Sequence, residues 1–247
     1  MSFFIPTDFA AASNSYQNQT DLAQLIVKIH QELLPQLRIE SIRPYNPVVV
    51  QHIPEPWQVL GTGNYAGVFY HPDHSELVVK VYAPGRQGWE EELEVYCRLG
   101  SHPAFSECLY AENNYLVLKR LHGTTLYDCM HQGIKIPQQV IKDIDYALEY
   151  ARSRHLHPHD VHGRNVMMSN GRGLVVDVSD FLREEPCLAW EDLKKAYYWI
   201  YLPFFSWHRL TLPHSILDGV RASYRFFRRW LDRRQISHQN KSGKTAN

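Results

Sequence analysis

A polar segment at residues 155–168 lies between two regions of opposite character. Before it, apolar residues recur with the helical period from Val140 to Ala151, after a proline suited to the first turn of a helix. After it, a MetMet pair and the run LeuValValAspVal flank a SerAsnGly turn, which predicts a β-hairpin. The segment itself reads HisLeuHisProHisAspValHisGlyArgAsnValMetMet, so the junction of helix and hairpin is rich in side chains that bind metals and protons.

Three of the polar side chains around this junction are Asp160, Asn165 and Asp177. Asn165 follows Asp160 by five residues, and Asp177 follows Asn165 by twelve residues. They supply two carboxylates and one amide oxygen, which are hard ligands of the kind that magnesium prefers. The residue types therefore suit a site that holds a divalent cation.

The rest of the chain predicts two lobes of different structure. Its 247 residues, 44% of them hydrophobic, are enough to bury a sizeable core. Short apolar runs separated by Gly, Pro and Asn turns predict strands between residues 46 and 121, interrupted by one helix at Trp89–Leu99. After Gly123 the pattern is helical, with further helices near Trp190–Leu202 and His214–Arg234. We expect an extension with a loose start and an amphipathic helix from Thr20 (1–45), a sheet lobe (46–121), a helical lobe (122–236) and a disordered tail (237–247).

A glycine-rich turn and a lysine stand among the predicted strands. The turn reads GlyThrGlyAsnTyrAlaGlyVal, and Gly61 and Gly63 would let the backbone approach a phosphate without a Cβ in the way. Lys80 lies within the apolar run GluLeuValValLysValTyr, where an unpaired ammonium would be costly to desolvate. Lys80 therefore either extends to water from an edge strand or binds an anionic partner such as ATP phosphates and a carboxylate. The following helix offers Glu90, Glu91, Glu92 and Glu94, of which only one is expected to point inward.

The glycine-rich turn, Lys80, the segment with Asp160 and Asn165, and Asp177 follow one another over residues 57–180. The order and spacing of these four elements resemble those of the protein-kinase superfamily. The resemblance implies an α+β, two-lobed fold with an N-terminal antiparallel sheet of five strands and one helix, and ATP and Mg²⁺ as cofactors. It implies that Asp160 is the catalytic base, that Asn165 and Asp177 hold the metal, and that His162 contacts the γ-phosphate region. It pairs Lys80 with Glu92, with Glu91 or Glu94 as alternatives. The implied ATP-binding residues are Gly61, Gly63, Ala66, Val68, Lys80, Lys119 and Leu121.

The sequence also departs from the family pattern. Ala66 replaces the third glycine, ProHisAsp replaces the usual His-Arg-Asp, and AspValSer replaces Asp-Phe-Gly. No AlaProGlu and no long activation segment follow Asp180. In this respect the chain resembles small atypical members: the RIO-like, lipopolysaccharide-kinase-like and aminoglycoside-phosphotransferase-like groups. The resemblance implies transfer of the ATP γ-phosphate to a hydroxyl of Ser or Thr in a protein, with a small-molecule acceptor as the alternative.

Two rival interpretations remain open. Four histidines and one aspartate lie within eight residues and could form the metal centre of a hydrolase: His155, His157, His159, Asp160 and His162. Their register differs from the His-x-His-x-Asp-His pattern of metallo-β-lactamases, and this interpretation does not explain Gly61, Lys80 or Asp177. The altered triplets instead allow an ATP-binding pseudokinase, although the charged positions needed for transfer are all occupied.

Net charge and cysteine spacing indicate which binding partners and which cellular compartment suit the chain. The chain has 26 basic and 26 acidic residues, so no global field favours nucleic acid or a membrane. The four cysteines are scattered without paired spacing, which fits a reducing compartment, and three of them, Cys97, Cys108 and Cys129, are expected to be buried. The first residues carry no basic stretch ahead of a long apolar run, and we expect a cytoplasmic protein.

The C-terminal part of the sequence combines aromatic and basic residues. Arginines surround an apolar stripe in the predicted helix His214–Arg234, which would suit an anionic membrane or a nucleic acid. We expect instead a closing helix with its stripe in the core and its arginines in water, without nucleic-acid binding. The preceding aromatic cluster is likewise expected in the core: Tyr197, Tyr198, Trp199, Phe204 and Phe205.

Overall fold

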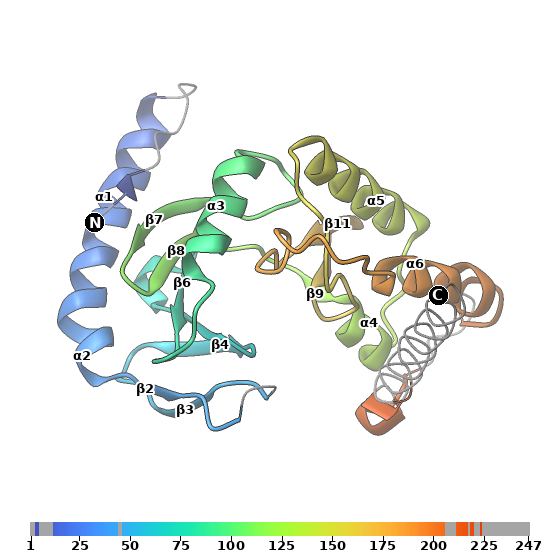
Figure 1. Cartoon of the computed structure of the whole chain (residues 1–247), viewed down its shortest axis with the longest axis horizontal. Helices are drawn as coiled ribbons and strands as arrows, with labels where there is room; N and C mark the ends of the chain where they lie inside the picture. The colour runs from blue at the N-terminus through green and yellow to red at the C-terminus, as the bar shows by residue number, and fades with distance from the viewer. Residues whose placement is uncertain are drawn as a thin grey trace, which may run out of the picture.

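The computed structural model describes residues 3–4, 12–43, 46–205, 211–216, 218–219 and 223. Within these residues the chain forms two lobes, a sheet with helices on both of its faces and a mostly helical part (Figure 1). The sheet has six strands in the order β1-β7-β8-β6-β5-β4, and all neighbouring strands are antiparallel. The strands are β1 (Phe3–Phe4), β4 (Gln58–Thr62), β5 (Ala66–Tyr70), β6 (Leu77–Tyr82), β7 (Cys108–Glu112) and β8 (Tyr115–Lys119).

Of the five strands that the sequence predicts, four coincide with β4, β5, β6 and β8, and no apolar run was placed at β7. Strand β1 pairs with the edge strand β7 and has no signal in the sequence, because two residues are too short for a period-two pattern. A separate two-stranded sheet of β2 (Arg38–Glu40) and β3 (Val49–His52) was also not predicted. Strand β2 begins and ends with a charged residue, and the pairing of β2 with β3 shifts in register between Arg38 and Ile39. The alternation of apolar and polar residues is therefore weak in this sheet.

Alternation along β6 decides where Lys80 points. Val79 and Val81 pack on the outer face of the sheet, whereas Val78 and Tyr82 belong to the core shared with the helical lobe. Lys80 lies on the same face as Val78, since residues two apart share a face of a strand. β6 is flanked by β5 and β8, so the interpretation of Lys80 as a lysine extending to water from an edge strand is wrong.

The two faces of the sheet are covered by different helices. Helix α3 (Trp89–Leu99), with the bounds that the sequence predicts, packs Val95, Tyr96 and Leu99 on the inner face. The outer face is covered by the N-terminal helix, which consists of α1 (Ala12–Lys28), the π-helical turn η1 (Ile29–Leu33) and α2 (Leu34–Gln36). Its buried residues Leu25, Ile29 and Leu33 belong to one core cluster with Val79 and Val117 of the sheet. The helix runs alongside the sheet lobe (Figure 1).

This N-terminal helix is longer than the sequence predicts. We expected a start at Thr20 and a loose segment before it, but α1 begins at Ala12. Once the buried turns are formed, each further helical residue adds a hydrogen bond without a new nucleation cost, so polar residues extend the helix. Pro35 lies in the first turn of α2, where its missing N–H is tolerated.

The helical lobe places the polar segment between a helix and a hairpin, as predicted. Helix α5 (Gln138–Ser153) packs on the hairpin of β10 (Val166–Ser169) and β11 (Arg172–Val175). The short strand β9 (Thr124–Thr125) pairs with β10 and completes a three-stranded sheet. Helix α4 (Leu126–Gln132) follows β9 directly. The run to residue 178 implied that Asp177 lies within the second strand of the hairpin. This strand instead ends at Val175, so Asp177 lies in the loop that follows it.

The lobe continues with α6 (Ala189–Ala196) and the π-helical segment η3 (Tyr197–Phe205). Tyr197 is buried as expected, but Tyr198, Trp199 and Phe204 are 37%, 78% and 69% exposed, so the prediction of a buried cluster is wrong for these three. The side chain of Phe205 lies outside what the structure describes. The segment is apolar on every side, and without a polar face its sequence does not distinguish inner from outer positions. Among the described residues, no helix combines the length and the apolar character that crossing a membrane requires.

The described cysteines are all free thiols. Cys108 and Cys129 are buried as expected, and burial raises the pKa of these thiols to about 12 and about 11. Cys97 is exposed, contrary to expectation, because it lies one residue beyond the inward-facing Tyr96 of α3. Of the predicted closing helix, only residues 214–216, 218–219 and 223 are described, and the predicted tail lies outside the described residues.

Candidate active site

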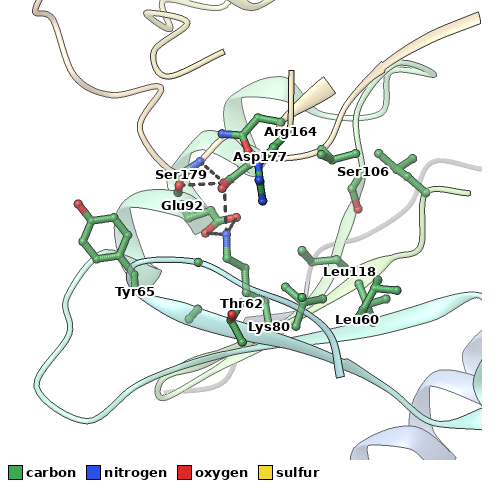
Figure 2. Close-up of a pocket in the computed structure, with 18 of the residues that line it drawn as sticks. Leu60, Thr62, Tyr65, Lys80, Glu92, Ser106, Leu118, Arg164, Asp177 and Ser179 are labelled. Atoms are coloured by element: carbon green, nitrogen blue, oxygen red, sulfur yellow. Dashed lines mark hydrogen bonds and ion pairs between the residues drawn. The ribbon is translucent and has the colours of Figure 1, made fainter. Parts of the chain in front are cut away.

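Lys80 joins three elements at the floor of the space between the lobes. Its Nζ lies 2.8 Å from Oε1 and 2.7 Å from Oε2 of Glu92 on α3, and 3.4 Å from Oδ1 of Asp177 (Figure 2). Of the four glutamates of α3, Glu92 is the one that is fully buried. The structure therefore pairs Lys80 with Glu92 and not with Glu91 or Glu94.

The charges of this group support one another. Burial alone would lower the pKa of the Lys80 ammonium, but the Asp177 and Glu92 carboxylates raise it above its ordinary value. Burial raises the pKa of Glu92, and Lys80 opposes this shift only in part. Burial also acts to raise the pKa of Asp177, yet Lys80 and Ser179 outweigh it and hold the pKa below its ordinary value. Lys80 is thus a cation between two acidic groups of different affinity for protons.

Tyr82 and Ser179 complete the shell of this group, and sequence reasoning missed both. The Tyr82 hydroxyl donates to Oε2 of Glu92, and Tyr82 shares the face of β6 with Lys80 because it follows by two residues. The backbone N–H of Ser179 donates to Oδ1 of Asp177 at 3.2 Å, and its hydroxyl donates at 2.8 Å. This is the local bond that an Asp forms with the residue two positions on, so the sequence carried a signal for it.

The polar segment between α5 and β10 is held by its own backbone. Asp160 has a positive φ of 52°, and its N–H donates to Sγ of Cys187 at 3.3 Å. The Asn165 side-chain amide donates to the Asp160 carbonyl at 3.1 Å, and the Val176 N–H donates to the Asn165 carbonyl at 3.0 Å. These bonds tie the segment to the residue before Asp177, so the predicted trio Asp160, Asn165 and Asp177 is brought to one place.

Every residue of the predicted site lines one cavity of about 420 Å³. Gly61, Gly63, Ala66 and Val68 form one wall, and the space beside the Gly61 Cα is open, since a Cβ there would meet no atom within 4 Å. The remaining predicted residues that line the cavity are Lys80, Glu92, Lys119, Leu121, Asp160, His162, Asn165 and Asp177. His162 Nε2 lies 3.7 Å from Oδ2 of Asp160.

The cavity is also lined by apolar side chains and a short backbone segment. Leu60, Val78 and Leu118 line it together with Lys119 and Leu121. The Lys119 N–H donates to the Glu107 carbonyl, and its carbonyl accepts from the Ser106 hydroxyl at 2.6 Å. The Arg120 N–H donates to the Glu76 carbonyl at 2.7 Å, so these groups already have partners within the protein.

Two further cavity residues, Tyr65 and Arg164, were not predicted. Arg164 lies 3.8 Å from the Tyr127 ring centroid and donates to Oδ1 of Asp218 at 2.7 Å. The Tyr65 hydroxyl accepts from Arg183 at 2.9 Å, a contact between the glycine-rich turn and the helical lobe. Both contacts join residues more than 50 positions apart, so local sequence patterns carry no signal for them.

The histidine-rich segment does not form a metal centre among the described residues, where no group of three or more His, Cys, Asp or Glu side chains is placed to hold an ion. The His159 Nδ1 instead lies 3.2 Å from the Glu185 carbonyl.

The six-stranded antiparallel sheet, the inner helix that carries Glu92 and the helical lobe with its polar loop define an α+β fold in two lobes, as the sequence predicts. Among known proteins, a Bacillus subtilis protein named "Putative serine/threonine-protein kinase YrzF" is 29% identical over 150 residues, which are 60% of this chain and 70% of that protein.

A solved structure, a variant of the PknI kinase domain of Mycobacterium tuberculosis, aligns with a TM-score of 0.39 and 21% identity. The alignment covers 60% of this chain and 64% of that one, so it spans less than two thirds of the known domain. No family model matches the chain.

Proposed function

We propose that the chain is a phosphotransferase that moves the γ-phosphoryl group of ATP to a hydroxyl. The observation that carries this proposal is the Lys80 ammonium held between Glu92 and Asp177 at the floor of a cavity that Asp160 and Asn165 also line. A buried, permanently charged lysine beside a glycine-rich wall is suited to bind phosphate oxygens. The B. subtilis relative, by its name, supports the same chemistry.

The donor set fits a magnesium ion. Lys80 and Ser179 both bind Asp177 at Oδ1, and the Asn165 amide nitrogen donates to a carbonyl. The groups that these two residues present to an ion are therefore a carboxylate oxygen and an amide oxygen. Asn165 and Asp177 would hold the ion, which supplies neutralisation of the phosphate charge during transfer.

The other residues of the chain have distinct roles in this proposal. Lys80 orients the phosphates, and Glu92 fixes the position of the ammonium. Asp160, 53% exposed in the cavity, accepts the proton of the attacking hydroxyl, and His162 contacts the phosphate being transferred. Since Lys119 and the Arg120 N–H are bonded within the protein, the Leu121 amide is the backbone group we assign to adenine.

The acceptor is assigned with two alternatives. The name of the B. subtilis relative favours Ser or Thr in a protein. A specific observation favours a small molecule as the second candidate: only residues 178–188 connect Asp177 to α6 at Ala189, and so short a connection leaves little chain to dock a peptide. In both cases the group that attacks is a hydroxyl.

Asp160→Asn tests the proposal. We expect the rate of transfer from γ-labelled ATP to fall by roughly 10²–10⁴-fold, with nucleotide affinity within about twofold of wild type, because a proton acceptor is lost while the phosphate contacts remain. Asp73→Asn, a change at an exposed aspartate that does not line the cavity, is the matched control. Protein extracts and small polyol substrates are assayed separately as acceptors.

The possible results separate the alternatives. Unchanged turnover in Asp160→Asn contradicts the assignment of the base. Binding of ATP by the wild type without transfer to any acceptor favours the pseudokinase. Weaker nucleotide binding in Lys80→Ala and in Asp177→Ala is expected if these residues bind the phosphates and the ion.

A further inference from the structure

Arg164 lines the cavity but has no role in the proposed chemistry. Among the described residues that line the cavity, those from the helical lobe include one permanently charged cation, and it is Arg164. Its side chain lies on the helical-lobe side of the pocket, opposite Thr62 of β4 (Figure 2). The glycine-rich wall and Lys80, which are assigned to the ATP phosphates, come from the sheet lobe. Arg164 therefore shares its lobe with the assigned base Asp160.

Two neighbours fix the plane of the Arg164 guanidinium. Its Cζ lies 3.8 Å from the centroid of the Tyr127 ring, and its Nη2 donates to Oδ1 of Asp218 at 2.7 Å. The Tyr127 hydroxyl donates to the same Asp218 oxygen at 2.9 Å. An arginine held in this way has its N–H groups already oriented, so it loses little conformational freedom when it binds an anion.

The Asp218 carboxylate is an anion of the protein itself that already occupies part of this guanidinium. Tyr127 and Arg164 hold the pKa of Asp218 below its ordinary value, so this carboxyl is ionised at neutral pH. The side chains of Arg164 and Asp218 are 41% and 54% exposed, so water screens the pair and a second anion can compete for it. A guanidinium also carries five N–H groups, which is more than one carboxylate oxygen can occupy.

The position of Arg164 in the chain places such an anion close to the reacting hydroxyl. Asp160 precedes Arg164 by four residues, and the Arg164 N–H donates to Nδ1 of His162 at 3.3 Å. The three side chains line the same cavity. Because the Asp160 carboxylate repels an anionic acceptor, a cation in the same segment is needed to offset this repulsion.

We propose that Arg164 binds an anionic group, a phosphate or a carboxylate, which the acceptor carries close to its reacting hydroxyl. This inference rests on the proposed phosphotransferase function and names the class of acceptor that this function leaves open. The anion belongs either to a small phosphorylated polyol or to an acidic side chain beside a Ser in a peptide. Both present the same chemistry to an arginine, namely oxygen atoms that accept charge-assisted hydrogen bonds.

Binding of matched acceptor pairs to the full chain tests the proposal. One pair is glycerol 3-phosphate and glycerol, and the other is a Ser peptide flanked by Asp and the same peptide flanked by Asn. Each compound is titrated with Mg²⁺ and a non-hydrolysable ATP analogue present, so that the phosphate positions are already filled. Wild type is expected to bind the anionic member of one pair at least roughly tenfold more tightly than the neutral member, and that pair identifies the source of the anion.

Two variants of the same ion pair are expected to act in opposite directions. Arg164→Gln should reduce the preference for the anionic member to within about twofold, because the charge-assisted bond is lost. Asp218→Asn should tighten binding of the anionic member by about two- to tenfold, because the competing carboxylate is removed. A purely structural role of the pair would instead make both variants weaken binding, since each breaks the same contact.

Arg98→Gln is the matched control for these variants. Arg98 is 39% exposed and bonded to Glu94 at 2.8 Å, and it does not line the cavity, so its removal should leave the preference as in wild type. Circular dichroism and thermal unfolding verify that each variant is folded.

The proposal is overturned if wild type shows no preference within either pair, if folded Arg164→Gln keeps the preference, or if Asp218→Asn weakens binding as Arg164→Gln does. It is also overturned if Arg164→Gln weakens binding of the ATP analogue by roughly tenfold or more, since Arg164 would then belong to the nucleotide site. Transfer from γ-labelled ATP to the same acceptors tests the underlying function separately. Arg164-dependent binding without any transfer by wild type supports the anion site and contradicts the phosphotransferase.

Discussion

Lys80 serves two carboxylates that differ in burial. Glu92 is fully buried and 2.7 Å away, whereas the Asp177 side chain is 37% exposed and 3.4 Å away. The shorter, buried contact fixes the lysine on α3. The longer, exposed one leaves the Asp177 carboxylate able to bind a cation in the cavity, so the same lysine has a structural partner and a functional partner.

Lys80→Met should make stability depend on pH in a new way. It leaves Glu92 buried without its cation, so the pKa of Glu92, already raised by burial, rises further. The folded variant then retains a proton that the unfolded chain releases above about pH 4, and its stability falls as pH rises. We expect a loss of about 3–5 kcal/mol at about pH 8, and a smaller loss at about pH 5, by urea denaturation.

Lys195→Met is the control for this prediction. Lys195 is 68% exposed and 3.6 Å from Asp192, so its removal should change the free energy of unfolding by less than about 1 kcal/mol. A loss of stability in Lys80→Met that is equal at both pH values would show that Glu92 does not carry the penalty.

Single residues were predictable where local chemistry limits the choices. An ammonium in an apolar strand requires an anion, which led to Lys80 and to a glutamate of the next helix. The choice among Glu91, Glu92 and Glu94 rested on resemblance, because all three lie in one helical turn or next to it. Arg164 was missed since its partner Asp218 is 54 positions away and is joined to it only by the fold.

At the scale of elements, the close contact of α5 and β11 sets the site. A Cβ on Gly173 would lie 2.4 Å from the Val140 carbonyl oxygen and 2.8 Å from Cγ1 of Ile144. The Gly173 N–H also donates to Asp143 at 3.0 Å, and Arg172 holds the pKa of that carboxyl down at about 2. Since α5 leads into the polar segment and β11 leads into Asp177, this contact fixes both sides of the site.

Gly173→Ala should therefore separate helix and hairpin. The added methyl group meets backbone as well as side chain, so we expect the free energy of unfolding to fall by about 1–3 kcal/mol, measured by urea denaturation. Gly61→Ala, where a Cβ meets nothing within 4 Å, should leave the free energy of unfolding nearly unchanged. Equal stability of the two variants would mean that α5 moves aside freely.

Elements with a strong period were predicted, and those without one were not. The helix at Trp89–Leu99 and the strands around Lys80 carry clear patterns and were found in place. The start of α1 and the short strands β1 and β2 depend on tertiary partners, because their own residues do not alternate or repeat for long enough. Asp177 was placed in a strand since the apolar run continues past the point where strand pairing ends.

For the whole molecule, the N-terminal helix makes the sheet lobe a three-layer body. It buries Leu25, Ile29 and Leu33 against Val79 and Val117 of the outer face. The sheet is thus enclosed by α3 on one side and by the N-terminal helix on the other, and the lobe should lose stability as a unit when either layer is weakened.

Ile29→Ala tests this coupling. Ile29 is fully buried, so we expect a loss of about 2–5 kcal/mol in the free energy of unfolding, with nucleotide affinity of the folded protein unchanged because Ile29 does not line the cavity. Val27→Ala on the same helix, at a position 50% exposed, should cost less than about 0.5 kcal/mol. Similar losses at both positions would contradict a specific contact with the sheet.

The overall architecture was predictable because the order of β and α regions is written in successive patterns along the chain. Which apolar residues face water was not, as Trp199 shows. Hydrophobicity alone assigned it to the core, yet a uniformly apolar segment contains no information about its own orientation.

The position of the N-terminal helix also bears on the order in which the chain folds. His30 of this helix contacts the Tyr115 hydroxyl at 3.1 Å, across 85 residues of sequence. During synthesis the apolar side of the helix has no surface to cover until β8 has been made, and contacts so distant in sequence form slowly. Until then the nascent chain exposes an amphipathic helix, which is the kind of segment that chaperones bind. We expect the apolar side of this helix to be buried only after the sheet is complete.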